Sequence, residues 1–326
     1  MKYRPSLDLS RFLRCEKMSG LRSPCLGVSI GRQLLTASRV HTKRGKNSVQ
    51  WEDVRELDIP MFEGVANKKA EDCLYDGLSS FADINRSKRF RTQVALAGPA
   101  VSIQTFSFQS FKKSSISKEK LLRLRFADEM GIDADSISCT YQHYGLKNDQ
   151  EFILGVAIDT GWLNCIKSAF QRTGLVASSI EFDAAYAFNQ VVTKSKLPTS
   201  GGFLVYAGPE SWTIMIWDEL GVVHFVRSLW QPNPISKESS KHLFNTVEEI
   251  ERIVKSYTMR KNIHEISQVF IAGSRFSVDA IAEILNQRTV SPCRRVYSDY
   301  DLEQLIFEDE ALRNLNNQHY FVSIPL

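Results

Sequence analysis

The opening of the chain is divided into short apolar runs, a pattern typical of β-strands. Residues 26–40, LGVSIGRQLLTASRV, contain two apolar runs separated by a glycine and a short polar break, and this arrangement predicts a β-hairpin. A third strand is expected within 48–59, ending at Pro60. Residues 67–86 instead space their apolar side chains at helical intervals, and two more strands are expected within 93–108. The expected order of elements is therefore β-β-β-α-β-β.

The middle of the chain mixes helices and strands. Ser115 or Ser117 is expected to cap a helix that ends at Gly131, and two apolar strands follow it. The next helix is expected to end at Gly174, since glycine is common just past a helix C-terminus. A further strand and a short apolar helix are expected within 178–192.

The second half repeats the order of the first. After a loop at 194–202, the segment 202–217, GFLVYAGPESWTIMIW, again has an apolar run, a glycine turn and a second apolar run. A third strand is expected within 221–230, followed by a helix, a strand, a helix and a last short strand. The pattern predicts a duplication of architecture rather than of sequence.

The composition excludes several classes of protein. A chain of 326 residues with 43% hydrophobic residues is long enough for two packed domains. Its 41 Lys and Arg against 37 Asp and Glu leave a net charge of +4, too small and too dispersed to predict nucleic-acid binding. Six cysteines without any CxxC pair predict neither a zinc site nor a disulfide framework, and reduced cytosolic thiols are expected.

Membrane-targeting segments are also not expected. The first residues carry charges throughout, unlike a signal peptide, and no apolar run approaches the length of a membrane-spanning helix. If the protein works at a membrane, a partner is expected to hold it there.

A tight glycine turn between two strands can hold a phosphate, because backbone N–H groups at the turn converge on an anion. Two halves that each open with such a turn predict two phosphate loops across an interdomain cleft, where ligands commonly bind. In these segments the chain resembles the actin-like ATPase superfamily. Residues 26–40 resemble its first phosphate loop, 203–217 its second, and 269–285 its adenosine motif.

The segments between these motifs narrow the resemblance. Residues 94–108, 117–145 and 151–192 are similar to the subdomain that the type IV pilus assembly protein PilM and the cell-division protein FtsA insert into the first half. The stretch 174–188, GLVASSIEFDAAYAF, matches the family pattern except that Ala177 replaces a proline. The chain thus resembles the PilM family, with its MSHA-pilus relative MshI and the related cytoplasmic domain of GspL in type II secretion.

This resemblance implies an α/β, actin-like (ribonuclease H-like) duplicated fold, with two α/β halves and a small α+β subdomain inserted in the first half. The expected divisions are a polar leader at 1–22, the first part of half 1 at 23–92, the inserted subdomain at 93–178, the return to half 1 and a linker at 179–200, and half 2 at 201–326, its last residues returning toward half 1. The leader is expected either to be disordered or to contact a partner.

The phosphate loops depart from those of active family members. The first loop of active members has an aspartate where this chain has Ser29 and a lysine where it has Thr36, and their second loop has an aspartate where it has Tyr206. Those aspartates orient hydrated Mg²⁺ and the attacking water, so a change at both positions removes the oxygen ligands of the cation. Of the paired glycines in the adenosine motif, only Gly273 remains.

The resemblance therefore implies a degenerate nucleotide site. Gly31 and Gly208 can still approach a phosphate, and Arg32 or Arg275 can supply charge without metal. The alternative is that both glycines only form turns. No catalytic residue or metal ligand is predicted, and ATP with Mg²⁺ is a possible cofactor by resemblance alone. The residues assigned to this site are Gly27, Ser29, Gly31, Arg32, Tyr206, Gly208, Ser211, Gly273, Ser274 and Arg275.

The inserted subdomain carries the partner prediction. In the PilM family, a groove between this subdomain and the first half accepts the short cytoplasmic tail of PilN, a bitopic inner-membrane protein, as an extended peptide. Strand addition would supply main-chain hydrogen bonds and side-chain pockets. The resemblance places the groove near Phe106, Phe108, Ile153, Leu154 and Val156. The alternative is that these residues are buried strand positions.

Three functions stay open. The first is a cytoplasmic scaffold, peripheral to the inner membrane, that docks a PilN-like tail and helps couple an assembly ATPase to a type IV (MSHA-type) pilus or related secretion platform. The second is an enzyme, either an ATPase or a small-molecule kinase, which needs acidic groups where the sequence has serine and tyrosine. The third is a polymerising actin-like protein.

Overall fold

The structure is a computed structural model, and it describes the following residues: 25–43, 46–85, 91–109, 117–147, 150–185, 187–188, 202–208, 210–217, 223–231, 245, 247–253, 255–256, 268–273, 283 and 293–296. The leader at 1–22, Ser274 and Arg275 lie outside the described residues. The chain divides into a first unit, Leu7–Asp183 with Val322–Leu326, and a second unit, Ala184–Phe321 with Met1–Ser6. Within the described part of the chain, no helix is both long and apolar enough to cross a membrane.

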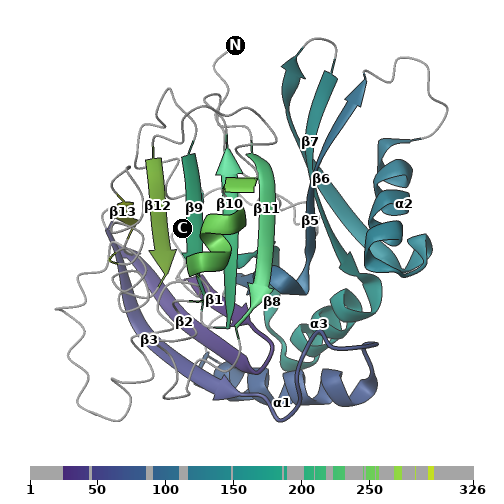
Figure 1. Cartoon of the computed structure of the whole chain (residues 1–326). Helices are drawn as coiled ribbons and strands as arrows, with labels where there is room; N and C mark the ends of the chain where they lie inside the picture. Colours follow the sequence, from purple (N-terminus) through teal and green to yellow (C-terminus); the bar gives the residue numbers. More distant parts are fainter. Residues whose placement is uncertain are drawn as a thin grey trace. The chain divides into compact units, whose positions relative to one another are not determined.

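The first unit contains a five-stranded sheet in the order β3-β2-β1-β4-β8 (Figure 1). Its strands are β1 (Cys25–Ile30), β2 (Leu34–Lys43), β3 (Lys46–Glu56), β4 (Arg91–Leu96) and β8 (Val176–Phe182). The first three strands pair antiparallel, whereas β1, β4 and β8 pair parallel. Pairing of β2 with β3 continues to Lys43 and Lys46.

Two helices cover one face of this sheet. They are α1 (Lys68–Asn85) and α3 (Thr160–Thr173), and their apolar side chains form one core with those of β1, β2 and β4. The carboxylate of Asp159 caps α3 by accepting a hydrogen bond from the N–H of Trp162 (3.2 Å). Gly174 ends α3 with φ of 74°, a left-handed conformation that suits glycine, as the sequence predicts.

Side-chain contacts also join α1 to α3. Oε1 of Glu71 accepts hydrogen bonds from Nζ of Lys68 (2.8 Å), Oγ of Ser168 (2.9 Å) and Nη1 of Arg172 (2.8 Å). Arg172 also donates to Oδ1 of Asp72 (2.7 Å). The donors hold the pKa of the Glu71 carboxyl at about 2, Lys68 making the largest contribution.

The first unit also holds a three-stranded antiparallel sheet in the order β5-β7-β6. Its strands are β5 (Ser102–Gln109), β6 (Ile137–Lys147) and β7 (Gln150–Asp159), with short 3₁₀ turns η2 (Gly98–Ala100) and η3 (Ala134–Ser136) before β5 and β6. Helix α2 (Lys118–Met130) packs on it through Leu122 and Phe126. Ser117, one of the two predicted caps, accepts from the N–H of Lys120 (3.2 Å), and Gly131 ends the helix with φ of 66°.

This layer, the three-stranded sheet with α2, spans residues 102–159, a narrower range than the 93–178 expected for the inserted subdomain. Most of β4 and all of α3 fall within that expected range, yet β4 pairs with β1 and β8, and α3 packs in the core of the five-stranded sheet. Strand β4 belongs to the five-stranded sheet, rather than to the inserted layer, because it pairs in parallel with β1.

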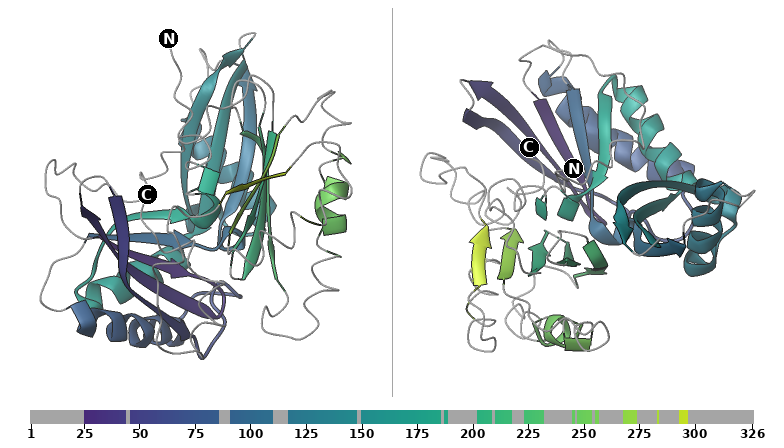
Figure 2. Two further views of the ribbon diagram at one scale, coloured as in Figure 1. Left: turned by 90° about the vertical axis from the view of Figure 1, so that its left-hand side faces the viewer. Right: turned by 90° about the horizontal axis from the view of Figure 1, so that it is seen from above.

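The second unit contains another five-stranded sheet, in the order β11-β10-β9-β12-β13 (Figure 2). Its strands are β9 (Gly202–Ala207), β10 (Ser211–Trp217), β11 (Val223–Trp230), β12 (Gln268–Gly273) and β13 (Cys293–Val296). Helical residues within 245–256 contribute Val247, Ile250 and Ile253 to the core on one face. Strands β9, β12 and β13 pair parallel, and β9, β10 and β11 pair antiparallel.

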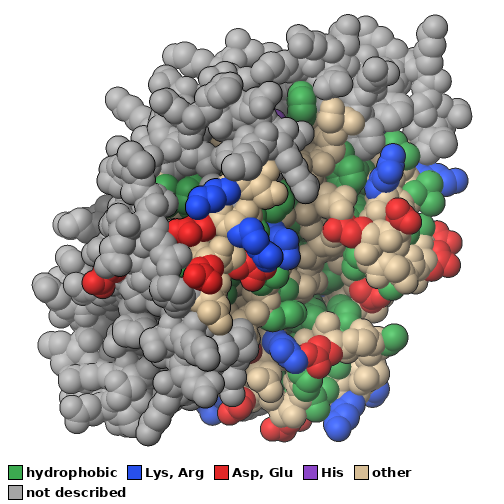
Figure 3. Space-filling view, in the orientation of Figure 1, with side chains coloured by type: hydrophobic (Ala, Val, Ile, Leu, Met, Phe, Trp, Pro, Cys, Tyr) green, Lys and Arg blue, Asp and Glu red, His purple; other side chains and the backbone are tan. Residues whose placement is uncertain are grey.

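The two five-stranded sheets thus have the same strand order and directions, with β1, β2, β3, β4 and β8 matching β9, β10, β11, β12 and β13. The predicted duplication of architecture is confirmed. On the face drawn in Figure 3, basic and acidic side chains of the described residues lie interspersed.

Candidate functional site

The two glycine turns of the predicted phosphate loops have the same internal hydrogen bond. In the first unit, the N–H of Gly31 donates to the carbonyl of Leu34 (2.8 Å). In the second unit, the N–H of Gly208 donates to the carbonyl of Ser211 (2.9 Å). Gly31, Gly208 and Ser211 are all buried, and Ser211 begins β10. Both turns are therefore formed by the backbone itself.

The third strand of each sheet closes its turn in the same way. The N–H of Leu57, directly after β3, donates to the carbonyl of Gln33 (2.7 Å). The N–H of Gln231, directly after β11, donates to the carbonyl of Glu210 (2.8 Å). These matched bonds make the first and second predicted phosphate loops structurally equivalent, a relationship that the sequence predicts only from their order.

In the first hairpin, Ser29 of β1 lies directly opposite Thr36 of β2. Both side chains are buried, Ser29 being 6% and Thr36 1% exposed. Directly opposed side chains in an antiparallel pair are close enough to interact, so an aspartate and a lysine at these positions would form an ion pair. Two hydroxyl groups offer neither charge nor the carboxylate oxygens that Mg²⁺ prefers.

In the second hairpin, Tyr206 of β9 and Thr213 of β10 occupy the equivalent opposed positions. Tyr206 is fully buried, and Oγ1 of Thr213 lies 2.9 Å from Oγ of Ser228 on β11. The opposed pairs in both hairpins therefore contain no carboxylate and do not fit a hydrated Mg²⁺. Among the residues that the structure describes, no cluster of three or more His, Cys, Asp or Glu side chains could hold a metal ion.

Arg32, which was expected to offer charge to a phosphate, pairs instead with Glu63. The backbone supports this contact, because the N–H of Met61 donates to the carbonyl of Arg32 (2.7 Å). A phosphate would have to compete with the Glu63 carboxylate for the guanidinium group. In the second turn, Pro209 has no N–H to offer an anion.

Gly273, the remaining glycine of the adenosine motif, lies so close to Ala207 of the neighbouring strand that a larger side chain does not fit. It ends β12 opposite Ala207 of β9, with φ of 145°. A Cβ atom at this position would lie 2.3 Å from the carbonyl oxygen of Ala207, far inside van der Waals contact. The glycine therefore allows two strands to approach, whether or not a nucleotide binds. The predicted neighbours Ser274 and Arg275 are not among the described residues.

Two acidic side chains are buried among the described residues. Asp183, directly after β8, is 2% exposed, and Glu210, in the second turn, is 7% exposed. Neither acid is among the site residues that the sequence predicts. The signal for Asp183 is a single acid in the otherwise apolar stretch 182–188, FDAAYAF. Neither acid belongs to the opposed pairs described above.

The thiols of Cys139 and Cys165 do not offer an alternative active site. Burial raises the pKa of the Cys165 thiol to about 11 and also raises that of Cys139. Both thiols are therefore protonated near neutral pH and are poor nucleophiles.

The predicted docking residues lie on two neighbouring strands. Phe106 of β5 is opposite Ile153 of β7, and its ring meets that of Phe126 edge-on at 5.4 Å. Ile153, Leu154 and Val156 are each no more than 1% exposed, so they are buried strand positions in this structure. Phe108 lies on β5, opposite Glu151.

The order β5-β7-β6 limits where a peptide strand can be added. The central strand β7 already pairs with β5 on one side and with β6 on the other. The backbone of Ile153, Leu154 and Val156 therefore cannot pair with an added strand. An added strand needs an outer edge of this sheet, on β5 or β6.

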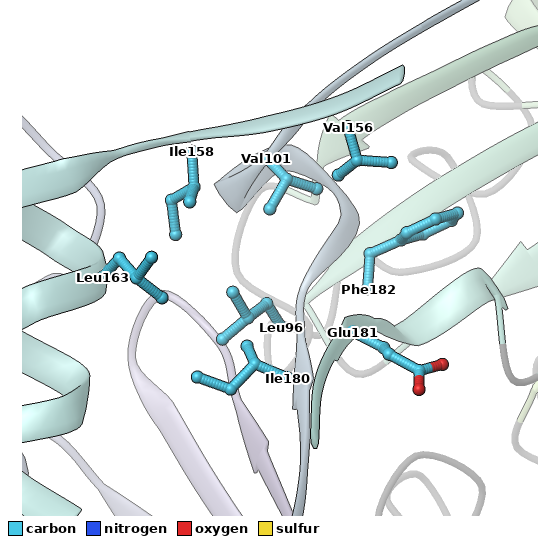
Figure 4. A pocket seen from close by; sticks show the side chains of 8 residues that line it. All are labelled: Leu96, Val101, Val156, Ile158, Leu163, Ile180, Glu181 and Phe182. Carbon is cyan, nitrogen blue, oxygen red and sulfur yellow. The ribbon is translucent and has the colours of Figure 1, made fainter. Parts of the chain in front are cut away.

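A small apolar pocket lies where β4, β7, β8 and α3 meet (Figure 4). Leu96, Val101, Val156, Ile158, Leu163, Ile180 and Phe182 line it, and the carboxylate of Glu181 points away from them. The space open to the centre of a water molecule is about 10 Å³, about enough for one water. The pocket is a packing gap rather than a ligand site.

The duplicated five-stranded sheets with matching glycine turns define a protein with the actin-like ATPase fold. A Bacteroides thetaiotaomicron protein with this fold and unknown function is similar, with a TM-score of 0.52 and 9% identity over 84% of this chain and 91% of that chain. Neither a family model nor a curated protein sequence matches this chain.

Within this fold, the chain is similar to a chain of the PilM–PilN type IV pilus biogenesis complex. The TM-score is 0.65 and the identity 14%, over 93% of this chain and 97% of that chain. The cytoplasmic domain of EpsL, an inner-membrane component of the type II secretion system of Vibrio cholerae, gives a TM-score of 0.43 and 13% identity, over 68% of this chain and 75% of that chain. The predicted duplicated α/β fold and the structural resemblance to PilM are confirmed.

Proposed function

We propose that this chain is a cytoplasmic scaffold of a type IV, MSHA-type pilus or a related secretion platform. It docks the cytoplasmic tail of a PilN-like inner-membrane protein, which keeps it peripheral to the membrane, and it helps couple an assembly ATPase to the platform. The observation that carries this proposal is the fold shared, over nearly the full length of both chains, with a chain of the PilM–PilN complex.

The three-stranded sheet supports the docking step. Its outer strand β5 pairs with β7 on one side, and no further strand partner of β5 occurs among the described residues. Helix α2 packs closest to the opposite outer strand, β6. An extended tail that pairs with β5 would gain main-chain hydrogen bonds without disturbing the core beneath α2. Phe106 and Phe108, two of the predicted docking residues, lie on this strand.

The opposed pairs support a function without ATP hydrolysis. By the sequence resemblance, Ser29 and Tyr206 occupy the positions at which an active phosphate loop carries carboxylates. Both residues are buried in their hairpins. An ATPase or kinase on this fold would need other groups to hold Mg²⁺.

The third function left open by the sequence is that of a polymerising actin-like protein. Polymerisation would be detected directly by sedimentation of the purified chain.

The docking step can be tested with a labelled peptide. The probe is the cytoplasmic N-terminal tail of a PilN-like protein from the same organism, and fluorescence anisotropy measures its dissociation constant. We expect saturable binding that weakens at least about tenfold in Phe108→Ala, a loss typical of an interface anchor. Leu124→Ala is the matched control, since Leu124 is 47% exposed on α2 of the same layer.

Two results would overturn parts of this proposal. A peptide that fails to bind the wild-type chain would remove the docking function. Equal affinities for wild type and Phe108→Ala would keep docking but remove the β5 edge as its site.

A further inference from the structure

Strand β3 is an outermost strand of the five-stranded sheet in the first unit (Figure 1). It pairs with β2 on one side, and in the described part of the chain no strand pairs with its other side. The free N–H and C=O groups of such an edge can pair with a strand of another chain, so proteins commonly protect their edges. The contacts of residues 53–57 therefore decide whether this edge is open.

The hydrogen bonds of the ladder identify the backbone groups of β3 that point outward. The N–H of Leu57 donates to the carbonyl of Gln33 (2.7 Å), and this pair continues the register of β3 with β2. Opposed residues in an antiparallel pair alternate between hydrogen-bonded and non-hydrogen-bonded positions. The backbone groups of Arg55 and Asp53 therefore bond to β2, whereas the N–H and carbonyl of Val54 point away from it.

The outward N–H of Val54 has a partner within its own strand. It donates to Oδ1 of Asp53 (2.9 Å). The other oxygen of this carboxylate, Oδ2, pairs with Nη2 of Arg55 (2.7 Å). The side chain of Asp53 is 23% exposed and that of Arg55 is 48% exposed, so the pair lies at the rim of the sheet. Arg55 thus holds the carboxylate where the carbonyl of an added strand would have to accept from Val54.

The charges of this segment also oppose pairing of two identical edges. Residues 52–58, EDVRELD, contain four acids and one arginine. In an antiparallel pairing of two copies centred on Val54, Glu52 of one copy would lie opposite Glu56 of the other, and like charges directly opposed are destabilising. Asp53 would lie opposite Arg55 of the other copy, but it could reach that position only by releasing Val54.

The duplicated sheet of the second unit differs at the equivalent place. By register, Arg227 of β11 stands where β3 has Asp53, and Ser228 stands where β3 has Val54. An arginine side chain has no acceptor for a backbone N–H. Nη2 of Arg227 lies instead 3.6 Å from Oε1 of Glu249. The carboxylate on the β3 edge is therefore a feature of the first unit and not a consequence of the duplicated fold.

We propose that Asp53, held by Arg55, closes the outer edge of β3 against strand pairing with a second copy of this chain. A second copy fits this edge, because an antiparallel pairing centred on Val54 would let the two copies exchange identical N–H···O=C bonds about a two-fold axis. The pairing is blocked while Val54 donates to Asp53. The proposal does not depend on docking of a tail peptide, whose proposed site is β5 of the other sheet in the first unit.

Sedimentation velocity of the full chain over a range of concentrations tests the proposal. The test variant is Asp53→Ala, which removes the acceptor of the Val54 N–H. Asp58→Ala is the matched control, since Asp58 is an exposed acid just after β3 and its removal changes the net charge equally. Arg55→Ala is a second test variant, which keeps Asp53 but removes the group that holds its carboxylate.

A double variant locates the contact. Asp53→Ala combined with Val54→Pro lacks the N–H that an added strand needs, and proline is tolerated where the N–H of an edge strand points outward. This double variant should therefore sediment as wild type even though Asp53 is absent.

We expect Asp53→Ala to self-associate with a dissociation constant at least about tenfold lower than that of wild type, because a backbone hydrogen-bonding edge is released. Arg55→Ala should change in the same direction by a smaller factor, and Asp58→Ala should sediment as wild type. If Asp53→Ala does not fold, the same criteria apply to Arg55→Ala.

Three results would overturn the proposal. The first is a folded Asp53→Ala chain that sediments as wild type at every concentration. The second is self-association of Asp58→Ala as strong as that of Asp53→Ala, which would assign the effect to charge alone. The third is self-association that persists in the proline double variant, which would place the contact elsewhere. Failure here leaves peptide docking untouched, since that is measured with a different ligand and different variants.

Discussion

Ser29 and Thr36 are direct cross-strand partners, and both are buried. By the sequence resemblance, active members of the fold are expected to carry an aspartate and a lysine at these two positions. Loss of only one member of such a pair would leave the other charge buried without a partner, which is strongly destabilising. Replacement of both by hydroxyl residues avoids that cost.

A double-mutant cycle at these positions tests this relationship. We expect Ser29→Asp alone to lower the free energy of unfolding by about 3–5 kcal/mol, because it buries an unpaired carboxylate. Addition of Thr36→Lys should recover part of that loss, with a favourable coupling of at least about 0.5 kcal/mol. Urea denaturation measures all four members of the cycle. Ser29→Asn is the uncharged control, and an additive cycle would show that the two side chains do not meet as the register indicates.

Gly273 provides a second prediction. We expect Gly273→Ala to destabilise the chain by about 3 kcal/mol or more without any nucleotide present, because the new Cβ would meet the carbonyl of Ala207. Gly64→Ala is the matched control: Gly64 also has positive φ, at 63°, but a Cβ added there would have no atom within 4 Å. The control should cost only about 1–2 kcal/mol.

Denaturation without ligand compares the two glycine variants. If Gly273→Ala were as stable as Gly64→Ala, close approach to Ala207 would not explain the glycine, and a ligand contact would become the better reason for it.

The contact of Arg172 with Glu71 predicts a pH dependence of stability. The pKa of Glu71 is lowered from 4.5 to about 2, so the folded state favours its ionised form. The resulting stabilisation is fully present above pH of about 4.5 and is lost as the pH falls toward about 2. Arg172→Ala removes one donor to Glu71, so the pKa should rise toward its ordinary value and the acid-dependent loss should shrink.

Denaturation at about pH 6 and about pH 3 measures this difference. Wild type should lose more stability between these values than Arg172→Ala does. Arg125→Ala, at an exposed arginine of α2, should behave as wild type. An equal acid-dependent loss in wild type and Arg172→Ala would contradict the contact.

Local sequence signals predicted much of the fold. Ser117, Gly131 and Gly174 stand at helix ends because hydrogen bonding of a cap and left-handed backbone are properties of single residues. The duplicated strand order also followed from apolar runs and glycine turns. The extent of the inserted layer did not, because membership of β4 in the larger sheet depends on parallel pairing with β1, which is distant in sequence.

The site was predicted less completely than the fold. Ser29 and Tyr206 were identified by resemblance, but the pairing of Arg32 with Glu63 depends on how the segment after β3 returns to the first turn. Ile153 and Leu154 are buried on β7, the central strand of its sheet. The order of strands in a sheet depends on pairing between distant segments, so the local sequence did not predict it.

The most direct test of the central claim is calorimetric titration of the chain with the PilN-like tail peptide, once with EDTA and once with ATP and Mg²⁺. A scaffold that docks its partner without a functional metal-nucleotide site should bind the peptide with the same dissociation constant in both conditions. Binding that requires ATP and Mg²⁺, or no binding in either condition, would contradict this account.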